Sequence, residues 1–129
     1  MTAEELAERL RKAAMSYPET REDQPWGHPA FKVKEKTFLF MGEHEGHVNI
    51  SIKLPDSNET ALGLPFVSPT HYGMGKYGWV TVKLEDDREP PLDMLVEWIH
   101  ESFLAVAPKR VGKSVGEDIP AAVEEALLG

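Results

Sequence analysis

Residues 73–78 have the sequence Gly-Met-Gly-Lys-Tyr-Gly, and this glycine spacing is the one that binds a phosphate in dinucleotide-binding proteins. Such binding requires a strand before the glycines and a helix after them, because the helix N-terminus faces the phosphate. Here the glycines follow a segment rich in proline and glycine, and an alternating pattern typical of a strand follows them. We therefore exclude a dinucleotide site and retain only a contact of Lys76 or the loop amides with a phosphate or a backbone oxygen.

The histidines are the second group of residues with chemistry of their own. His44 and His47 flank a predicted turn, and their spacing differs from the HExxH pattern that places two zinc ligands on one helix face. We interpret both as surface residues of that turn. His28 and His71 lie in predicted loops, where packing or hydrogen bonding is the ordinary role of the ring.

The sequence offers little for catalysis. It contains no cysteine, which excludes disulfides, zinc–thiolate sites and thiol nucleophiles. It also lacks a GxSxG motif and an acidic pair with an obvious base. We therefore expect no catalytic residue, no metal, no cofactor and no enzymatic activity.

The periodicity of apolar residues predicts the elements that position these side chains. Helices are expected over 3–17, 55–62, 92–106 and 118–128, and strands over 31–34, 37–41, 47–54 and 77–84. Residues 18–29 and 63–76 are rich in residues that break regular structure, so both are expected to be loops, and a tight turn is expected near Glu35-Lys36. The first three strands form an antiparallel meander with one apolar face.

Two amphipathic helices and a sheet with one apolar face define an α+β fold, a two-layer sandwich whose antiparallel sheet carries helices on one face. We predict that apolar strand residues pack on apolar helix residues: Val48, Ile50, Ile52, Val80 and Val82 against Leu6, Leu10, Leu95, Ile99 and Phe103. The chain is expected to be a single domain over 1–129, with a core at about 3–110 and a C-terminal helical extension at 114–129. The opposite sheet face is left open to solvent or to a partner.

Candidate binding residues lie on this open face or in the loop beside it. They are Lys32, Lys34, Lys53, His71, Lys76, Tyr77, Trp79 and Lys83. An aromatic pair on a wet sheet face is a recognition signal, and Tyr77 and Trp79 form that pair. The alternative is that the loop 18–29, which carries Trp26, folds over them and makes them part of a covered core.

Charge limits the choice of partner. The chain has 129 residues with 14 basic and 22 acidic side chains, so its net charge is −8, which argues against a nucleic-acid binder. The distribution is uneven, because the segments 64–84 and 108–116 contain lysine or arginine and no acid. No apolar run approaches the ~20 residues of a membrane span, so we expect no membrane contact. The acidic N-terminus does not resemble a signal peptide, and we expect a cytoplasmic protein. We also expect a monomer.

Several stretches, taken in order, carry a resemblance to a known family. They are Trp26-Gly27-His28-Pro29-Ala30-Phe31, the hairpin from Lys32 to Phe38, Ile52-Lys53, the loop His71 to Lys76 before Trp79-Val80, and Glu101-Ser102-Phe103. In this order the chain resembles the MmcQ/YjbR family of small bacterial proteins over residues 3–110.

The resemblance implies a frataxin-like (CyaY-like) α+β sandwich and a DNA-binding role with a double-wing arrangement. The positions that match the family pattern are Pro29, Phe31, Lys36, Lys53, Lys76 and Trp79. Two functions stay open: a DNA-binding protein that uses the open face and adjoining loops, and a protein- or small-ligand-binding module that uses the same face.

Overall fold

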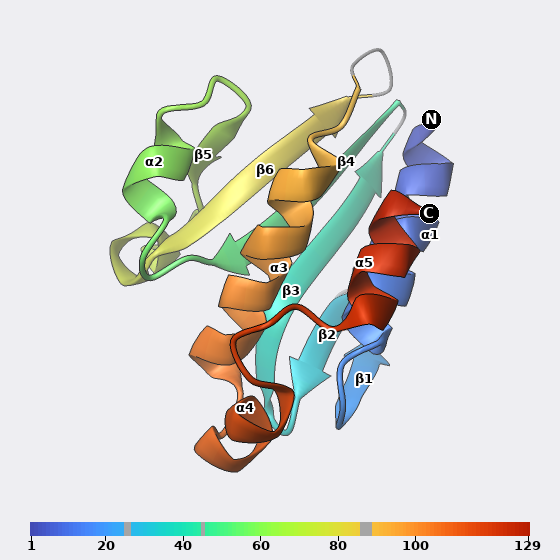
Figure 1. The fold of residues 1–129 in the computed structure, drawn as a ribbon. Coiled ribbons are helices and arrows are strands. Elements are labelled where there is room, and N and C mark those ends of the chain that lie inside the picture. The colour runs from blue at the N-terminus through green and yellow to red at the C-terminus, as the bar shows by residue number, and fades with distance from the viewer. Residues whose placement is uncertain (25–26, 45, 86–88) are drawn as a thin grey trace.

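The computed structural model describes residues 1–24, 27–44, 46–85 and 89–129. Its elements, labelled in Figure 1, are α1 (Ala3–Met15), β1 (Thr20–Asp23), β2 (Ala30–Val33), β3 (Lys36–His44), β4 (His47–Lys53), α2 (Asn58–Leu62), β5 (Val67–Pro69), the 3₁₀ helix η2 (Met74–Tyr77), β6 (Trp79–Glu85), α3 (Leu92–Val106), α4 (Lys109–Val115) and α5 (Ala121–Leu128).

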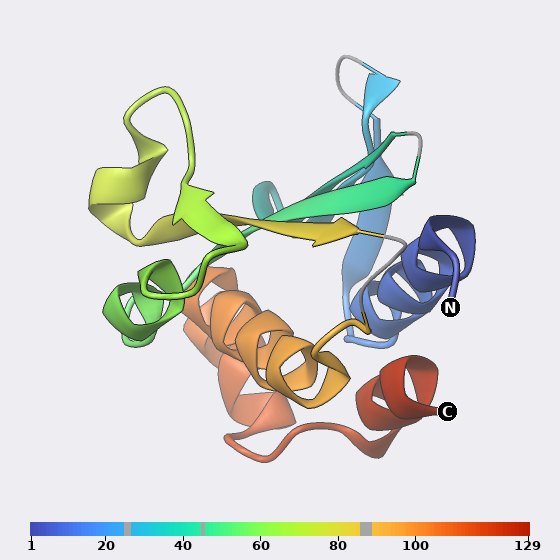
Figure 2. The same ribbon diagram turned by 90° about the horizontal axis from the view of Figure 1, so that it is seen from above.

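The sheet has six strands in the order β1-β2-β3-β4-β6-β5, and every neighbouring pair is antiparallel. Figure 2 shows α1, α3, α4 and α5 on one side of this sheet. In the described part of the chain no layer of α-helices covers the other side, which is called the open face below. The predicted α+β class, with helices on one face of an antiparallel sheet, is confirmed.

The core lies between the sheet and the helices. All ten residues predicted to pack across this boundary are buried in one apolar cluster, and α3 contacts β3 and β4 while α1 does the same. Burying a Val, Leu, Ile or Phe side chain contributes about 1.5–3 kcal/mol, so this cluster is the main stabilising feature of the fold. Val123 and Leu127 of α5 belong to the same cluster, which joins the C-terminal segment to the core.

Two strands occupy segments that were predicted to be loops. β1 lies within 18–29 and pairs with β2, and β5 lies within 63–76 and pairs with β6. Both are edge strands of few residues, and β5 ends at a proline. Backbone hydrogen bonds to the neighbouring strands β2 and β6 hold these two strands, so their sequences need no alternating apolar pattern.

Two candidate site residues that were predicted on strands do not lie on them. The strand predicted from Tyr77 begins at Trp79, because Met74–Tyr77 form η2, and Tyr77 therefore lies beside the sheet. Lys34 lies in the turn between β2 and β3 with φ of 57°, whereas the turn was predicted at Glu35-Lys36. A tight hairpin turn needs a residue with a left-handed backbone conformation, and here Lys34 adopts that conformation.

The C-terminal region also differs from the prediction. It contains two helices, α4 and α5, where one was predicted over 118–128, and α5 begins only after Pro120. α3 is buried over a wider arc than its apolar stripe, because His100 and Ser102 are buried as well. His100 bonds the segment between α4 and α5, whereas Ser102 bonds Phe38 of β3 and Lys53 of β4, so each polar residue faces a neighbouring element.

Candidate functional site

The open face presents side chains that alternate with the buried residues of the central strands. Register pairs Lys53 with Trp79, Ser51 with Thr81 and Asn49 with Lys83 across β4 and β6. These positions agree with the period-two prediction. The middle of the face therefore combines hydroxyl, amide, lysine and aromatic groups.

Trp79 lies against Phe40 of β3 on the open face. Their ring centroids are 5.6 Å apart with an interplanar angle of 51°, and both residues are half-buried. Phe40 was not predicted as a site residue, although it alternates with the buried Leu39 and Met41. The alternative, in which the loop 18–29 with Trp26 folds over Tyr77 and Trp79, concerns Trp26, and this residue lies outside the described residues.

Neighbouring hydroxyl groups form a polar strip next to this aromatic pair. Thr81 Oγ1 hydrogen-bonds with Ser51 Oγ at 2.9 Å and with Thr70 Oγ1 at 3.0 Å. Asn49 Oδ1 is buried and accepts no hydrogen bond from the part of the chain that the structure describes. An unsatisfied acceptor of this kind favours a donor from outside the protein.

Lys53 is positioned by α3. Ser102 Oγ accepts a hydrogen bond from Lys53 N at 2.9 Å and donates one to Phe38 O at 2.6 Å. The neighbouring Glu101 accepts hydrogen bonds from the backbone N–H groups of Asp56 and Ser57 at 2.9 and 3.0 Å. The Glu101-Ser102-Phe103 stretch thus connects α3 to the end of β4 and to the turn before α2.

The loop from Thr70 to Gly78 has a defined backbone. Thr70 N donates to Trp79 O at 3.2 Å, Gly75 N to Thr70 O at 3.2 Å and Gly78 N to Gly75 O at 3.1 Å. Gly78 has φ of +89°, and a Cβ built there would lie 3.2 Å from Leu54 O. This glycine therefore allows the close approach of the two backbone segments.

This loop exposes aromatic and basic side chains. Tyr72 is 99% exposed and Tyr77 is 63% exposed. Lys76 Nζ lies 5.3 Å from the centroid of the Tyr77 ring, and the exposed His71 ring lies 6.4 Å from that of Tyr72. In Figure 2 the loop rises on the side of the sheet away from the helices. We call the set Phe40, Lys53, Tyr72, Lys76, Tyr77 and Trp79 the aromatic–lysine patch.

Three of the predicted binding lysines are engaged in ion pairs. Lys32 Nζ lies 3.2 Å from Asp23, Lys34 Nζ 2.9 Å from Glu19 and Lys83 Nζ 3.6 Å from Glu85. The bond from Lys32 lowers the pKa of Asp23 below its ordinary value.

Within the described ranges, no acid pairs with Lys53 or Lys76. These two lysines are therefore the predicted cations that remain free for an anionic partner.

Three histidines, His28, His44 and His47, gather at the other end of the sheet. The rings of His44 and His47 lie 5.3 Å apart across the β3–β4 hairpin, and those of His28 and His44 lie 6.3 Å apart. Within the described residues, no three His, Cys, Asp or Glu side chains are arranged to hold a metal ion. None of the helices described is long and apolar enough to cross a membrane.

These features define an α+β protein whose antiparallel sheet is covered by helices on one face and presents aromatic and polar side chains on the other. The sequence model of the YjbR family matches residues 15–105, so the chain belongs to the YjbR family.

A solved structure supports the fold. The crystal structure of Deinococcus radiodurans protein DR2400, with a DUF419 domain, is similar at a TM-score of 0.70 and 22% sequence identity. The similarity covers 88% of this chain and 91% of that one. At this identity the likeness concerns the fold alone. No curated protein matches the sequence.

Proposed function

We propose that this protein binds DNA weakly, without sequence specificity and without catalysis, through the aromatic–lysine patch. The observation that carries the proposal is the position of Lys53 and Lys76, which have no acidic partner among the described residues, beside aromatic rings at one end of the open face. Tyr72 and Tyr77 are exposed, and the Trp79–Phe40 pair is half-buried. We propose that the protein acts in the cytoplasm as a monomer.

Stacking and charge contribute differently to this binding. An aromatic ring that stacks on a base contributes about 1–3 kcal/mol, whatever the base. Each lysine that neutralises a phosphate contributes to the binding free energy, and this contribution falls as the salt concentration rises. The net charge of −8 opposes a polyanion at low ionic strength, so we expect a dissociation constant in the micromolar range or weaker.

The patch favours single strands over duplex DNA. In a duplex the base faces are stacked on one another, so an aromatic side chain reaches a base face only after unstacking. Tyr72 and Tyr77 project from a loop and offer their rings to an unstacked base.

The test is a fluorescence anisotropy titration of labelled oligo-dT and of a duplex of equal length at two salt concentrations. Tyr72→Ala and Trp79→Ala are expected to weaken single-strand binding by about 1–3 kcal/mol each where the ring stacks. Tyr72 is almost fully exposed, so its variant keeps the fold. Absence of salt-sensitive binding by the wild-type protein at low ionic strength would refute the proposal.

A specific observation favours the second candidate, a module that binds a protein or a small ligand on the same face. The buried Asn49 Oδ1 lacks a partner within the described residues, and Lys83 beside it is held by Glu85. A ligand with a hydrogen-bond donor would satisfy this acceptor. Asn49→Leu separates the two functions, because it removes the acceptor and leaves the aromatic–lysine patch intact.

A further inference from the structure

The end of the molecule at the β2–β3 turn carries an excess of basic side chains. We call this set the basic end: Arg21, Lys34, Lys36, Lys109, Arg110 and Lys113. All six are exposed. The acids bonded to them are Glu19 and Glu35, so the basic end is positive in a chain whose net charge is −8.

Glu19 joins the parts of the basic end. Its carboxylate accepts two hydrogen bonds from Arg110 of α4, each at 3.0 Å, and pairs with Lys34 of the β2–β3 turn at 2.9 Å. These bonds from Arg110 and then Lys34 lower the pKa of Glu19 to about 2, so this carboxylate stays charged at neutral pH. α4 is therefore held against the turn, and its other lysines lie at the same end.

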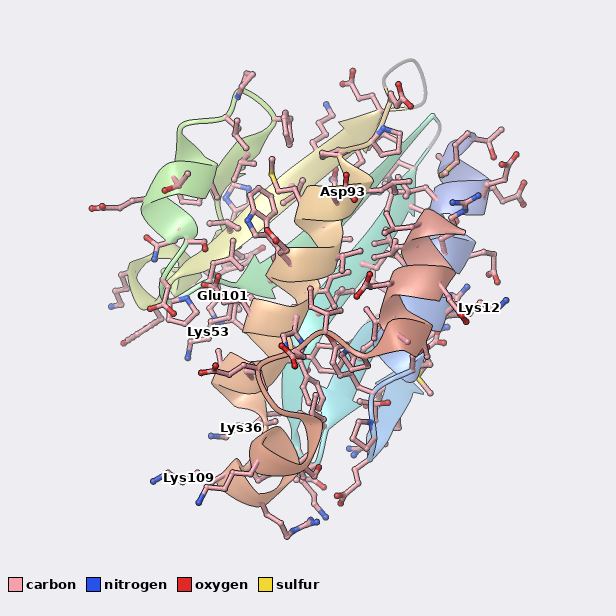
Figure 3. The ribbon with its side chains drawn as sticks, viewed as in Figure 1. Lys12, Lys36, Lys53, Asp93, Glu101 and Lys109 are labelled. Carbon is pink, nitrogen blue, oxygen red and sulfur yellow. The ribbon has the colours of Figure 1, made fainter. Side chains whose placement is uncertain are left out.

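Three lysines of the basic end have no acidic partner among the residues described. They are Lys36, Lys109 and Lys113. Figure 3 shows Lys36 and Lys109 at the same end of the molecule, with Asp93 at the opposite end of α3. β3 begins at Lys36 where its antiparallel partner β4 ends at Lys53, so the aromatic–lysine patch adjoins the basic end.

We propose that the basic end is a second phosphate-binding surface for the nucleic-acid strand whose bases stack on the aromatic–lysine patch. Lys36, Lys109 and Lys113 contact the sugar-phosphate backbone. This inference rests on the proposed function and adds residues that the candidate site did not include.

The composition of the basic end favours a nucleic acid over an acidic protein. Protein interfaces centre on aromatic or large apolar anchors. The exposed large apolar residues of the described chain are Met1, Met15, Leu62, Tyr72, Tyr77 and Leu128, and none of them lies on α4 or in the β2–β3 turn, which carry most of the basic end. A surface of cations without such an anchor fits a phosphate backbone, which is held mainly by charge.

The experiment measures the affinity of the full chain for oligo-dT over a range of salt concentrations. Lys36→Glu and Lys109→Glu are compared with Lys12→Glu, a matched control on α1 with the same change of charge (Figure 3). The salt slope is the slope of log affinity against log salt concentration. Each basic-end variant is expected to lower its magnitude by about 0.7, because it removes one lysine from the phosphate backbone. Lys12→Glu is expected to leave the slope unchanged.

A second variant acts in the opposite direction. Glu19→Gln releases Lys34 and Arg110 and removes one negative charge, so the basic end is expected to bind oligo-dT more tightly and with a steeper salt slope. A merely unfolded variant would not gain affinity.

The length of the oligonucleotide gives a further test. A strand of about four nucleotides spans little more than the aromatic–lysine patch, so the basic-end variants are expected to bind it like wild type.

The outcomes separate the two claims. If Tyr72→Ala weakens binding while Lys36→Glu and Lys109→Glu match Lys12→Glu, the basic end is not an interface, and the proposed function stands. If the wild type binds no oligonucleotide, both fail. If polyglutamate competes as well as oligo-dT of equal charge, the partner of the basic end is an acidic protein, and the inference is wrong.

Discussion

Gly78 fixes the position of the loop that carries the exposed tyrosines. Its O accepts a hydrogen bond from Leu54 N at 2.8 Å, and its φ of +89° brings the backbone close to Leu54 and Pro55. A side chain at this position would meet Leu54 O, whereas Gly73, with φ of +75°, has open space around it. The two glycines thus share a backbone conformation and differ in their surroundings.

This difference predicts unequal costs of substitution. Gly78→Ala is expected to lower the free energy of unfolding by about 2–3 kcal/mol, from the strained backbone and the close approach together. Gly73→Ala carries the backbone strain alone and is expected to cost about 1 kcal/mol. Urea unfolding monitored by circular dichroism measures both values. Equal costs would show that the approach to Leu54 imposes no constraint.

At the residue scale, sequence periodicity predicted where side chains point and did not predict their partners. Alternation placed Lys53, Trp79 and Lys83 on the open face, as observed. The ion pairs depend on elements far apart in the chain, as in the bond from Arg110 to Glu19. The basic segment 108–116 was visible in the sequence, but its position close to Lys34 in space follows from the fold.

At the element scale, a buried polar chain connects the segment after α1, helix α3 and the segment between α4 and α5. The Tyr17 hydroxyl lies 2.9 Å from His100 Nδ1, and His100 Nε2 lies 3.2 Å from Gly116 O and 3.1 Å from Glu117 O. Because carbonyl oxygens only accept, Nε2 carries the proton in the neutral ring, and Nδ1 accepts from Tyr17. Burial raises the pKa of Tyr17, which keeps that hydroxyl protonated.

Tyr17→Phe therefore leaves the buried His100 Nδ1 without a donor. We expect the free energy of unfolding to fall by about 1–3 kcal/mol. Tyr77→Phe is the matched control, since the exposed Tyr77 hydroxyl has no buried partner in the described structure and its removal is expected to have no effect. If denaturant unfolding gives the same stability for both variants, the polar chain contributes nothing.

The predictability of an element depended on how much apolar surface it buries. β4, β6 and α3 bury a regular stripe, and their patterns predicted both element and face. β1 and β5 form at the edges of the sheet by backbone pairing, so their sequences lack that signal. η2 depends on loop hydrogen bonds and on glycine conformations.

At the scale of the whole molecule, charge is separated along the strands. The basic end lies where β3 begins, and the acids Glu43, Glu85, Glu89 and Asp93 lie toward the end where β3 and β6 finish and α3 begins. A polyanion approaching such a molecule is attracted to one end and repelled by the other. The net charge of −8 therefore understates the local attraction on which the proposed function depends.

The measurement that tests the location of the interface most directly is a backbone amide NMR titration of the wild-type protein with oligo-dT at low salt. We expect chemical-shift changes at Lys53 and across residues 70–79, with the exposed surfaces of α1 and α5 unchanged. Tyr72→Ala is expected to reduce these changes at equal oligonucleotide concentration. Changes confined to the helix layer, or none at an oligonucleotide excess, would contradict binding at the open face.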